Sequence, residues 1–343
     1  MSKTNNIWFA PLAALYGLGV GIRNLCYEHG LFRSHKVGLP TICVGNLAVG
    51  GTGKTPHVEW LIRFLTQENY RVAVLSRGYR RKTHGFYVAD ENSTALQLGD
   101  ECMQLHRKFP DVTIAVCENR VRGIHLLQRH CPAVQVVILD DAFQHRRLEC
   151  GFNILLTTAD NLYVHDHFLP WGRLRDSAHQ SLRANTIIVT KCPDNMTAID
   201  RRTIIHELHV PAYQQLLFSS VRYADWSPDV ASLPASARVL VLAGIAHPEY
   251  LLEHVRKRFP NADLRAYGDH HAFTNNDIAR LEQAAQEYEL VLTTEKDMSR
   301  LSLCELSDQL KQRLYPVEIE ISILDDVPFK EQIRHYLAKL NIN

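Results

Sequence analysis

An excess of charge of either sign is missing from this chain of 343 residues, in which Lys and Arg total 38 and Asp and Glu total 37. Such a chain lacks the broad basic field that binds nucleic acid, so no nucleic-acid partner is expected. The eight cysteines include no C-x-x-C pair, and their spacing matches neither a zinc site nor a disulfide framework. They are typical of reduced core cysteines in a cytosolic protein.

A long apolar run is also missing. Residues 7–22 carry no charge, but a helix of that length reaches only about 24 Å, short of the roughly 30 Å hydrocarbon core of a bilayer. The segment also lacks a convincing signal-peptide cleavage site. It fits an apolar N-terminal helix in the membrane interface, with Trp8 and Tyr16 at headgroup level. An anionic membrane surface is favoured by the basic residues that follow, Arg23, Arg33 and Lys36. The alternative is a buried helix that caps the first domain.

The segment 44–56, VGNLAVGGTGKTP, lies between an apolar run and an amphipathic one, where a P-loop belongs. Its glycines let backbone N–H groups point at phosphate oxygens, Lys54 can reach the β- and γ-phosphates, and the Thr55 hydroxyl can ligate Mg²⁺. The expected nucleotide-binding residues are Gly50, Gly51, Thr52, Gly53, Lys54 and Thr55. Ala48 replaces the first glycine of the motif, which relaxed forms accept. The alternative is a glycine-rich turn that binds nothing.

A second apolar strand, 135–139, delivers Asp140 and Asp141 at its C-terminal end. This is a Walker B arrangement, and in doubly wound sheets ligands lie at this edge, beside the P-loop. Asp140 is therefore expected to hold Mg²⁺ directly or through water. Asp141 is expected to assist in positioning the metal, with an ordinary helix N-cap as the alternative.

Short β-rich apolar runs alternate with helical patterns, which predicts βαβ units on a mostly parallel sheet. The strands are expected at 41–44, 72–76, 113–116, 134–139, 153–157 and 186–190, and then at 239–242, 264–267, 290–293 and 317–321. The predicted fold is α/β: a P-loop NTPase-like, mostly parallel sheet flanked by helices, with a second, smaller α/β domain. The expected division is an N-terminal membrane-associating helix and lead-in (1–36), a P-loop core (37–222), a connector (223–237) and the smaller C-terminal domain (238–343).

Two positions narrow the class of P-loop protein. Dimerising ATPases of the partition and arsenical-pump type carry an extra Lys where this chain has Val49. Guanine-specific NTPases need [NT]-K-x-D, and the segment 190–194, TKCPD, places its Asp one residue too far along. ATP is therefore the expected nucleotide. A GTP-dependent metallochaperone would also need a C-x-C metal site, which the sequence lacks.

Seven segments in a fixed order, spread over nearly the whole chain, resemble the lipid A 4'-kinases (tetraacyldisaccharide 4'-kinases) of Gram-negative bacteria. They are GN at 45–46 leading into the P-loop through Pro56, SRGY at 76–79, GDE at 99–101, DDAFQ at 140–144, LPWGRLR at 169–175, DHH at 269–271 and TTEKD at 293–297. The resemblance implies a kinase that transfers the γ-phosphate of ATP to the 4'-hydroxyl of tetraacyldisaccharide 1-phosphate, giving lipid IVA in lipid A biosynthesis. It also implies the cytoplasmic face of the bacterial inner membrane, as a monotopic or peripheral protein.

The resemblance also implies the base that accepts the proton of the sugar hydroxyl. Asp100 of the GDE segment would work with His270, which is preferred to His271 because the family pattern is firmer at the first His. An Asp that orients and charges a His is a common base arrangement. Taken on the residues alone, Asp100 is an ordinary carboxylate at a helix N-terminus. Lys54 completes the expected catalytic set, because it neutralises charge on the transferred phosphoryl group.

The segment 76–82, SRGYRRK, concentrates four cations beside an aromatic residue after the second strand. Arg77 and Tyr79 are expected to bind the acceptor's 1-phosphate or an anionic headgroup, and the alternative is a solvated charged loop. Glu295 and Lys296 are expected to contribute an ion pair near the domain interface. A monomer is expected. The competing functions are a P-loop ATPase that acts as a switch or chaperone, and a metal-dependent phosphoesterase.

Overall fold

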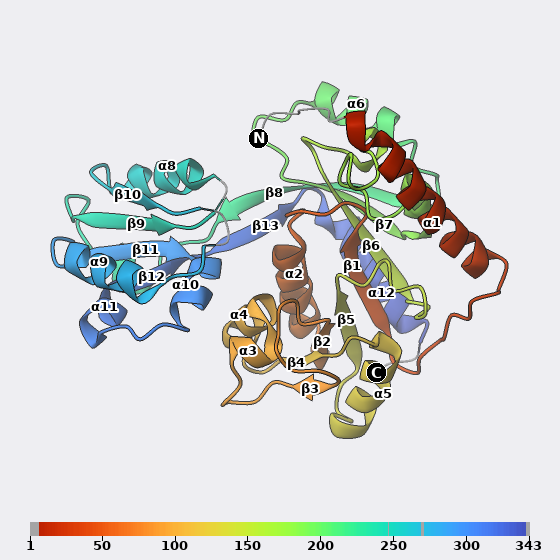
Figure 1. Cartoon of the computed structure of the whole chain (residues 1–343), viewed down its shortest axis with the longest axis horizontal. Coiled ribbons are helices and arrows are strands. Elements are labelled where there is room, and N and C mark those ends of the chain that lie inside the picture. Colours follow the sequence, from red (N-terminus) through yellow and green to blue (C-terminus); the bar gives the residue numbers. More distant parts are fainter. Residues whose placement is uncertain (1–6, 246, 269–270, 341–343) are drawn as a thin grey trace.

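The computed structural model describes residues 7–245, 247–268 and 271–340, which form two β-sheets flanked by helices (Figure 1). The larger sheet has the strand order β13-β8-β7-β6-β1-β5-β2-β4-β3. Its strands are parallel except at the two edges, where β13 is antiparallel to β8 and β3 is antiparallel to β4. They are β1 (Thr41–Asn46), β2 (Val72–Ser76), β3 (Tyr87–Val88), β4 (Thr113–Val116), β5 (Val136–Asp140), β6 (Phe152–Thr158), β7 (Thr186–Thr190), β8 (Gln215–Tyr223) and β13 (Ile319–Ile323).

Alternate side chains of the central strands enter two hydrophobic cores, one on each face of this sheet. Helices α2 (Lys54–Gln67), α4 (Asp100–Lys108) and α12 (Asp326–Ala338) cover one face, where Trp60 stacks on Phe329 with 5.3 Å between ring centroids. Helices α5 (Arg120–His130) and α6 (Ala198–Leu208) cover the other. The short helices of this lobe are α3 (Ala95–Leu98), η2 (Tyr163–His165) and η3 (Ala178–Arg183). The P-loop therefore follows directly from β1, a strand that is buried along its whole length.

The second sheet is smaller and wholly parallel, with the order β10-β9-β11-β12. Its strands are β9 (Val239–Ala243), β10 (Asp263–Ala266), β11 (Leu290–Thr294) and β12 (Leu314–Val317). Helices α7 (Pro228–Ala231) and α8 (Pro248–Arg258) pack on one face. Helices α9 (Asn275–Ala285), α10 (Glu295–Leu301) and α11 (Asp308–Arg313) pack on the other.

Two antiparallel strands, β8 and β13, join the lobes (Figure 1). Only Glu318 separates β12 from β13, yet these strands lie in different sheets, so the single strand expected at 317–321 is wrong. The alternation of apolar and polar residues runs through Glu318 without a break and does not show the change of sheet. Because β13 and α12 pack on the larger sheet, the second lobe ends before the expected boundary at residue 343. The other nine expected strands agree with the structure to within two residues at each end.

The N-terminal elements are η1 (Ile7–Phe9) and α1 (Ala10–Glu28), and α1 runs along the outside of the larger lobe (Figure 1). Only Ala13 and Asn24 of α1 are buried, so this helix is not a buried cap. Leu12, Leu15, Leu18, Ile22 and Leu25 are all exposed and recur at helical spacing; we call them the apolar face of α1. None of the helices in the described residues is long and apolar enough to cross a membrane.

Candidate active site

The loop between β1 and α2 is attached to its neighbours by side-chain hydrogen bonds. Asn46 Nδ2 donates to Thr52 Oγ1 at 2.8 Å, and Thr190 Oγ1 donates to the Thr52 carbonyl oxygen at 2.9 Å. Gly53, just before α2, has a φ of 84°, in the left-handed region that favours glycine. The N–H groups that open α2 have no partner within the helix, and together with the helix dipole they favour an anion.

A buried histidine that the sequence analysis missed supports the loop from within. His57 Nδ1 lies 2.7 Å from the Gly53 carbonyl oxygen, and Nε2 lies 3.0 Å from Ser219 Oγ on β8. Burial lowers the pKa of His57 to about 4, so the ring is neutral at pH 7. A neutral ring can donate to Gly53 and accept from Ser219, which links the P-loop to the strand that leads to the second lobe.

Asp140 ends β5 in a buried position, and Ser76 Oγ donates to its Oδ2 at 3.1 Å. Its Oδ1 is buried and has no hydrogen-bond partner among the described residues. Burial raises the pKa of Asp140 to about 7, and the charges of Glu101 and Asp141 add to the effect. A buried carboxylate oxygen without a partner is costly unless a cation joins it. Thr55, in the first turn of α2, completes the small ligand set that Mg²⁺ uses beside substrate phosphates, so these residues fit the metal.

Asp141 follows with a positive φ of 47°, which is uncommon outside glycine. The Arg175 guanidinium donates to both of its carboxylate oxygens, at 3.1 and 2.7 Å, and also to the Asn46 side chain. Lys54 Nζ lies 3.8 Å from Asp141 Oδ1. Burial would raise the pKa of Asp141, but its bonds to Arg175 and the charge of Lys54 hold that pKa below its ordinary value. Asp141 thus stays ionised and faces Lys54, and it is not an N-cap because turns follow it.

Arg120, a second residue that the sequence analysis missed, is buried at the start of α5. Its guanidinium donates to the carbonyl oxygens of Cys117 at 3.1 Å and Asp140 at 3.4 Å. Arg120 lines a cleft of about 670 Å³ together with Lys54 and both Walker B carboxylates. A buried guanidinium there supplies positive charge where phosphate oxygens would lie. No motif marked Arg120, because it meets the P-loop only through the packing of α5 on the sheet.

Arg77 and Tyr79 line the same cleft, and both are exposed. Gly99, just before Asp100, has a φ of 87° and a ψ of 156°, and a Cβ there would lie 2.6 Å from the Tyr79 carbonyl oxygen. The SRGY and GDE segments therefore touch backbone to backbone. Asp100 and Tyr79 share a small pocket with Lys296, which comes from α10 of the second lobe.

The expected His270 lies outside the described residues. Its neighbour His271 places Nε2 3.1 Å from Asp277 Oδ2 at the start of α9 and stacks on Tyr267 with 4.7 Å between ring centroids.

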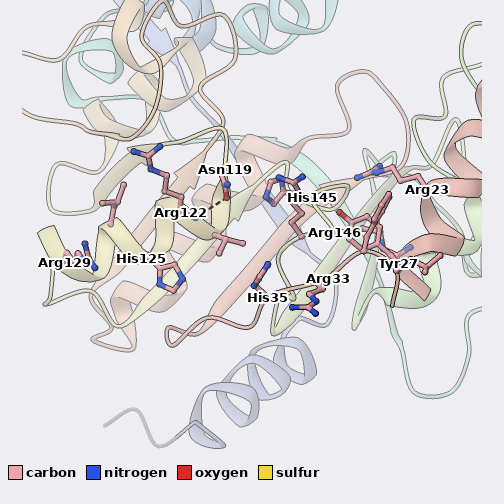
Figure 2. A pocket seen from close by; sticks show the side chains of 15 residues that line it. Arg23, Tyr27, Arg33, His35, Asn119, Arg122, His125, Arg129, His145 and Arg146 are labelled. Atoms are coloured by element: carbon pink, nitrogen blue, oxygen red, sulfur yellow. Dashed lines mark hydrogen bonds between the residues drawn. The ribbon is translucent and has the colours of Figure 1, made fainter. Parts of the chain in front are cut away.

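A large cationic hollow of about 1250 Å³ adjoins the cleft. Figure 2 shows the side chains that line it. Helix α1 supplies Arg23 and Tyr27, helix α5 supplies Arg122 and Arg129, and the segment after β5 supplies His145 and Arg146. The remaining lining residues include Arg33, His35, His125 and Arg147, and none of the described lining residues is acidic. His145 lines both the hollow and the cleft, so the two spaces lie next to each other at this residue. Arginine forks suit phosphate oxygens, which makes the hollow a candidate site for a phosphorylated ligand.

Helix α1 forms hydrogen bonds with residues 175–176, the segment whose Arg175 binds Asp141. Tyr16 Oη donates to the Arg175 carbonyl oxygen at 3.1 Å, and Asn24 Nδ2 donates to Asp176 Oδ1 at 2.7 Å. The N-terminal helix, the hollow and the P-loop cleft therefore lie next to one another.

The fold and this geometry define a P-loop protein that binds nucleotide phosphates at the carboxyl edge of a parallel sheet. Residues 5–338 match the family described as Tetraacyldisaccharide-1-P 4'-kinase, LpxK. The chain is 44% identical over 340 residues to the tetraacyldisaccharide 4'-kinase of Bacteroides thetaiotaomicron, which covers 93% of this chain and 89% of the relative. It is 42% identical over 337 residues to that of Porphyromonas gingivalis, with 94% of each chain covered.

A crystal structure of LpxK from Aquifex aeolicus in complex with ATP has a TM-score of 0.74 and 25% identity, covering 96% of this chain and 98% of that one. The chain therefore belongs to the tetraacyldisaccharide-1-P 4'-kinase family. This confirms the family that the seven motifs predicted and the P-loop fold. Family membership favours the kinase function over the switch ATPase and the phosphoesterase.

Proposed function

We propose that this family member transfers the γ-phosphate of ATP to the 4'-hydroxyl of tetraacyldisaccharide 1-phosphate and so produces lipid IVA. The bond between the γ-phosphorus and the bridging oxygen breaks, a bond from that phosphorus to the 4'-oxygen forms, and ADP leaves. The observation that carries the proposal is that the P-loop cleft and the arginine-lined hollow share the lining residue His145 and therefore lie side by side. An acceptor with its 4'-hydroxyl in the cleft could place its 1-phosphate in the hollow.

Charge neutralisation in the cleft falls to Lys54, the loop N–H groups and Arg120. Thr55 and Asp140 would hold Mg²⁺, which would supply positive charge to neutralise the phosphate oxygens. Asp141 keeps Lys54 directed toward the loop, and Arg175 keeps Asp141 in place.

Asp100 is proposed to accept the proton of the acceptor hydroxyl, with His270 of the second lobe as its partner. Its place at the start of α4, in a pocket beside Tyr79 and near the cleft, supports this role. Arg77 and Tyr79, exposed in the cleft, are proposed to hold the sugar end of the acceptor.

The apolar face of α1 is proposed to lie in the cytoplasmic surface of the inner membrane, as a monotopic or peripheral contact of a monomer. Five exposed aliphatic residues on one side of a helix, beside a cationic hollow, suit an anionic bilayer that contains a lipid acceptor.

The test is to incubate the purified protein in detergent with Mg-ATP and tetraacyldisaccharide 1-phosphate and to follow the acceptor by mass spectrometry. We expect a gain of one phosphate that Lys54→Ala abolishes and that Asp100→Asn slows while ATP binding stays nearly intact. Arg122→Gln should raise the KM for the acceptor but not for ATP, whereas Arg202→Gln, at an exposed position of α6, should change neither. Acceptor-independent ATP hydrolysis without lipid product would contradict the proposed reaction.

A further inference from the structure

One ammonium group meets three carboxylates where the two lobes touch. Lys108 Nζ lies 2.9 Å from Glu59 Oε2, 2.5 Å from Glu295 Oε1 and 2.9 Å from Glu318 Oε2. The side chains of Lys108, Glu59 and Glu295 are nearly buried, with exposed fractions of 12, 2 and 11%. Charge-assisted contacts this short and this sheltered from water are much stronger than surface ion pairs.

The three carboxylates belong to different parts of the molecule. Glu59 lies on α2, the helix that begins at Lys54 of the P-loop. Glu295 opens α10 of the second lobe, and Glu318 separates β12 from β13, where the chain returns to the larger sheet. Lys108 therefore contacts the P-loop helix, the second lobe and the link between them.

Lys108 and Asp100 are the last and first residues of the same helix, α4. On the other lobe, Glu295 is followed by Lys296, which lines the pocket that contains Asp100. Helix α10 is itself attached to its own sheet, because Asp297 is buried and accepts from Gly244 N at 2.8 Å. A shift of α10 at Glu295 would therefore move Lys296, and the sheet behind it, relative to Asp100.

The cluster holds more negative than positive charge. Arg63 lies 4.0 Å from Glu59 Oε2 and 3.6 Å from Glu320 Oε1, and Gln104 Nε2 donates to Glu59 Oε1 at 3.2 Å. Burial raises the pKa of Glu59 to about 7, against the lowering effect of Lys108. Without the ammonium of Lys108, the contact between α4 and α10 would lose the cation that pairs with Glu295, and the carboxylates that stay ionised would repel one another.

We propose that Lys108 is a positioning residue for phosphoryl transfer: it holds α10 of the second lobe against α4 and so sets the distance between that lobe and Asp100. The inference rests on the proposed function for its kinetic readout only. Lys108 touches no reacting atom and acts through α4 and α10.

The experiment compares Lys108→Met, Lys108→Arg and Glu295→Gln with Lys330→Met, which removes a lysine whose 2.7 Å ion pair with Asp326 lies within α12. Three quantities are measured on the full-length protein: kcat for transfer, the Kd for ATP, and hydrogen–deuterium exchange of α10. In Lys108→Met we expect kcat to fall by roughly 30-fold or more, since displacements near 1 Å can cost about 100-fold. The Kd for ATP should stay within about threefold, because the P-loop lies wholly in the larger lobe, and α10 should exchange faster.

Lys108→Arg should recover most of kcat, because a guanidinium can still donate to several carboxylates. Glu295→Gln leaves Lys108 paired with Glu59 and Glu318, so it should fold, lower kcat by a smaller factor and speed exchange in α10. The inference is overturned if Lys108→Met and Glu295→Gln match Lys330→Met in kcat and in exchange, or if the Kd for ATP weakens as much as kcat falls. If the wild type makes no lipid product, the proposed function has failed, while the exchange of α10 still reports on the contact.

Discussion

Replacing Gly99 by Ala tests whether the close contact between the SRGY and GDE segments positions Asp100. A Cβ would lie 2.6 Å from the Tyr79 carbonyl oxygen, about 0.7 Å closer than the shortest ordinary carbon–oxygen contacts of about 3.3 Å. The φ of 87° and ψ of 156° add backbone strain of about 1–3 kcal/mol for a residue other than glycine. The backbone must therefore move, and the residues nearest to that movement are Asp100 and Tyr79.

We expect Gly99→Ala to lower kcat by roughly 10- to 100-fold, since a displacement of about this size at a reacting group has that effect. ATP binding should change little, because the atoms nearest to the added carbon belong to Gly78 and Tyr79 and not to the P-loop. The matched control is Gly85→Ala, where φ is 76° but no atom lies within 4 Å of the added carbon. Steady-state transfer rates and ATP titrations of both variants measure the effect. Equal kcat values for Gly99→Ala and Gly85→Ala would refute the reasoning.

Three further predictions follow from the site and its surroundings. Arg175→Lys should lower kcat/KM for ATP by roughly tenfold or more, because an ammonium cannot hold both oxygens of Asp141 as a guanidinium does; steady-state rates within twofold of wild type would contradict this. Burial raises the pKa of Glu59 from 4.5 to about 7, so the folded state binds its proton more tightly and stability is lost as pH rises through that range. Glu59→Gln should remove that loss, which is worth about 3 kcal/mol. In thermal melts, the Tm of the wild type should therefore fall relative to that of the variant as the pH rises from 4.5 to about 7. A constant difference in Tm across this range would argue against the prediction. Changing three leucines of the apolar face of α1 to Gln should release the protein from anionic vesicles in a sedimentation assay, and undiminished binding would exclude that face as the membrane contact.

Much of the fold could be predicted because its signals are local. A buried parallel strand reads as a short apolar run whatever surrounds it, which is why β2, β4 and β7 agree residue for residue with expectation. The strand β8 was missed, because its outer half is exposed or half-buried and its pairing with β13 joins residues about a hundred positions apart. The break at Glu318 was missed for a related reason: a change of sheet leaves no mark on an uninterrupted alternation of apolar and polar residues.

The residues of the site also divide into those that a local motif reveals and those that only packing brings together. Lys54, Thr55 and Asp140 belong to motifs whose spacing reflects the contact of a backbone with phosphate, so their roles can be read from the chain. Arg120 and His57 belong to no such motif. Arg120 reaches the Asp140 carbonyl oxygen only once α5 packs on the sheet, and His57 of α2 finds its second partner, Ser219, on the distant strand β8. Asp100 could be selected only through the family resemblance, because a carboxylate at a helix start is common.

By itself, the sequence determined the strand–loop–helix of the P-loop, the carboxylates at the end of β5 and the family, since each depends on motifs whose residues are neighbours in the chain. Tertiary structure alone decided that Arg175 fastens Asp141, that arginines from α1, α5 and the segment after β5 form one hollow, and that Lys108 meets three carboxylates between the lobes. Charges so far apart in sequence acquire a common role only when packing brings them within a few ångströms, where they act through a medium less polar than water.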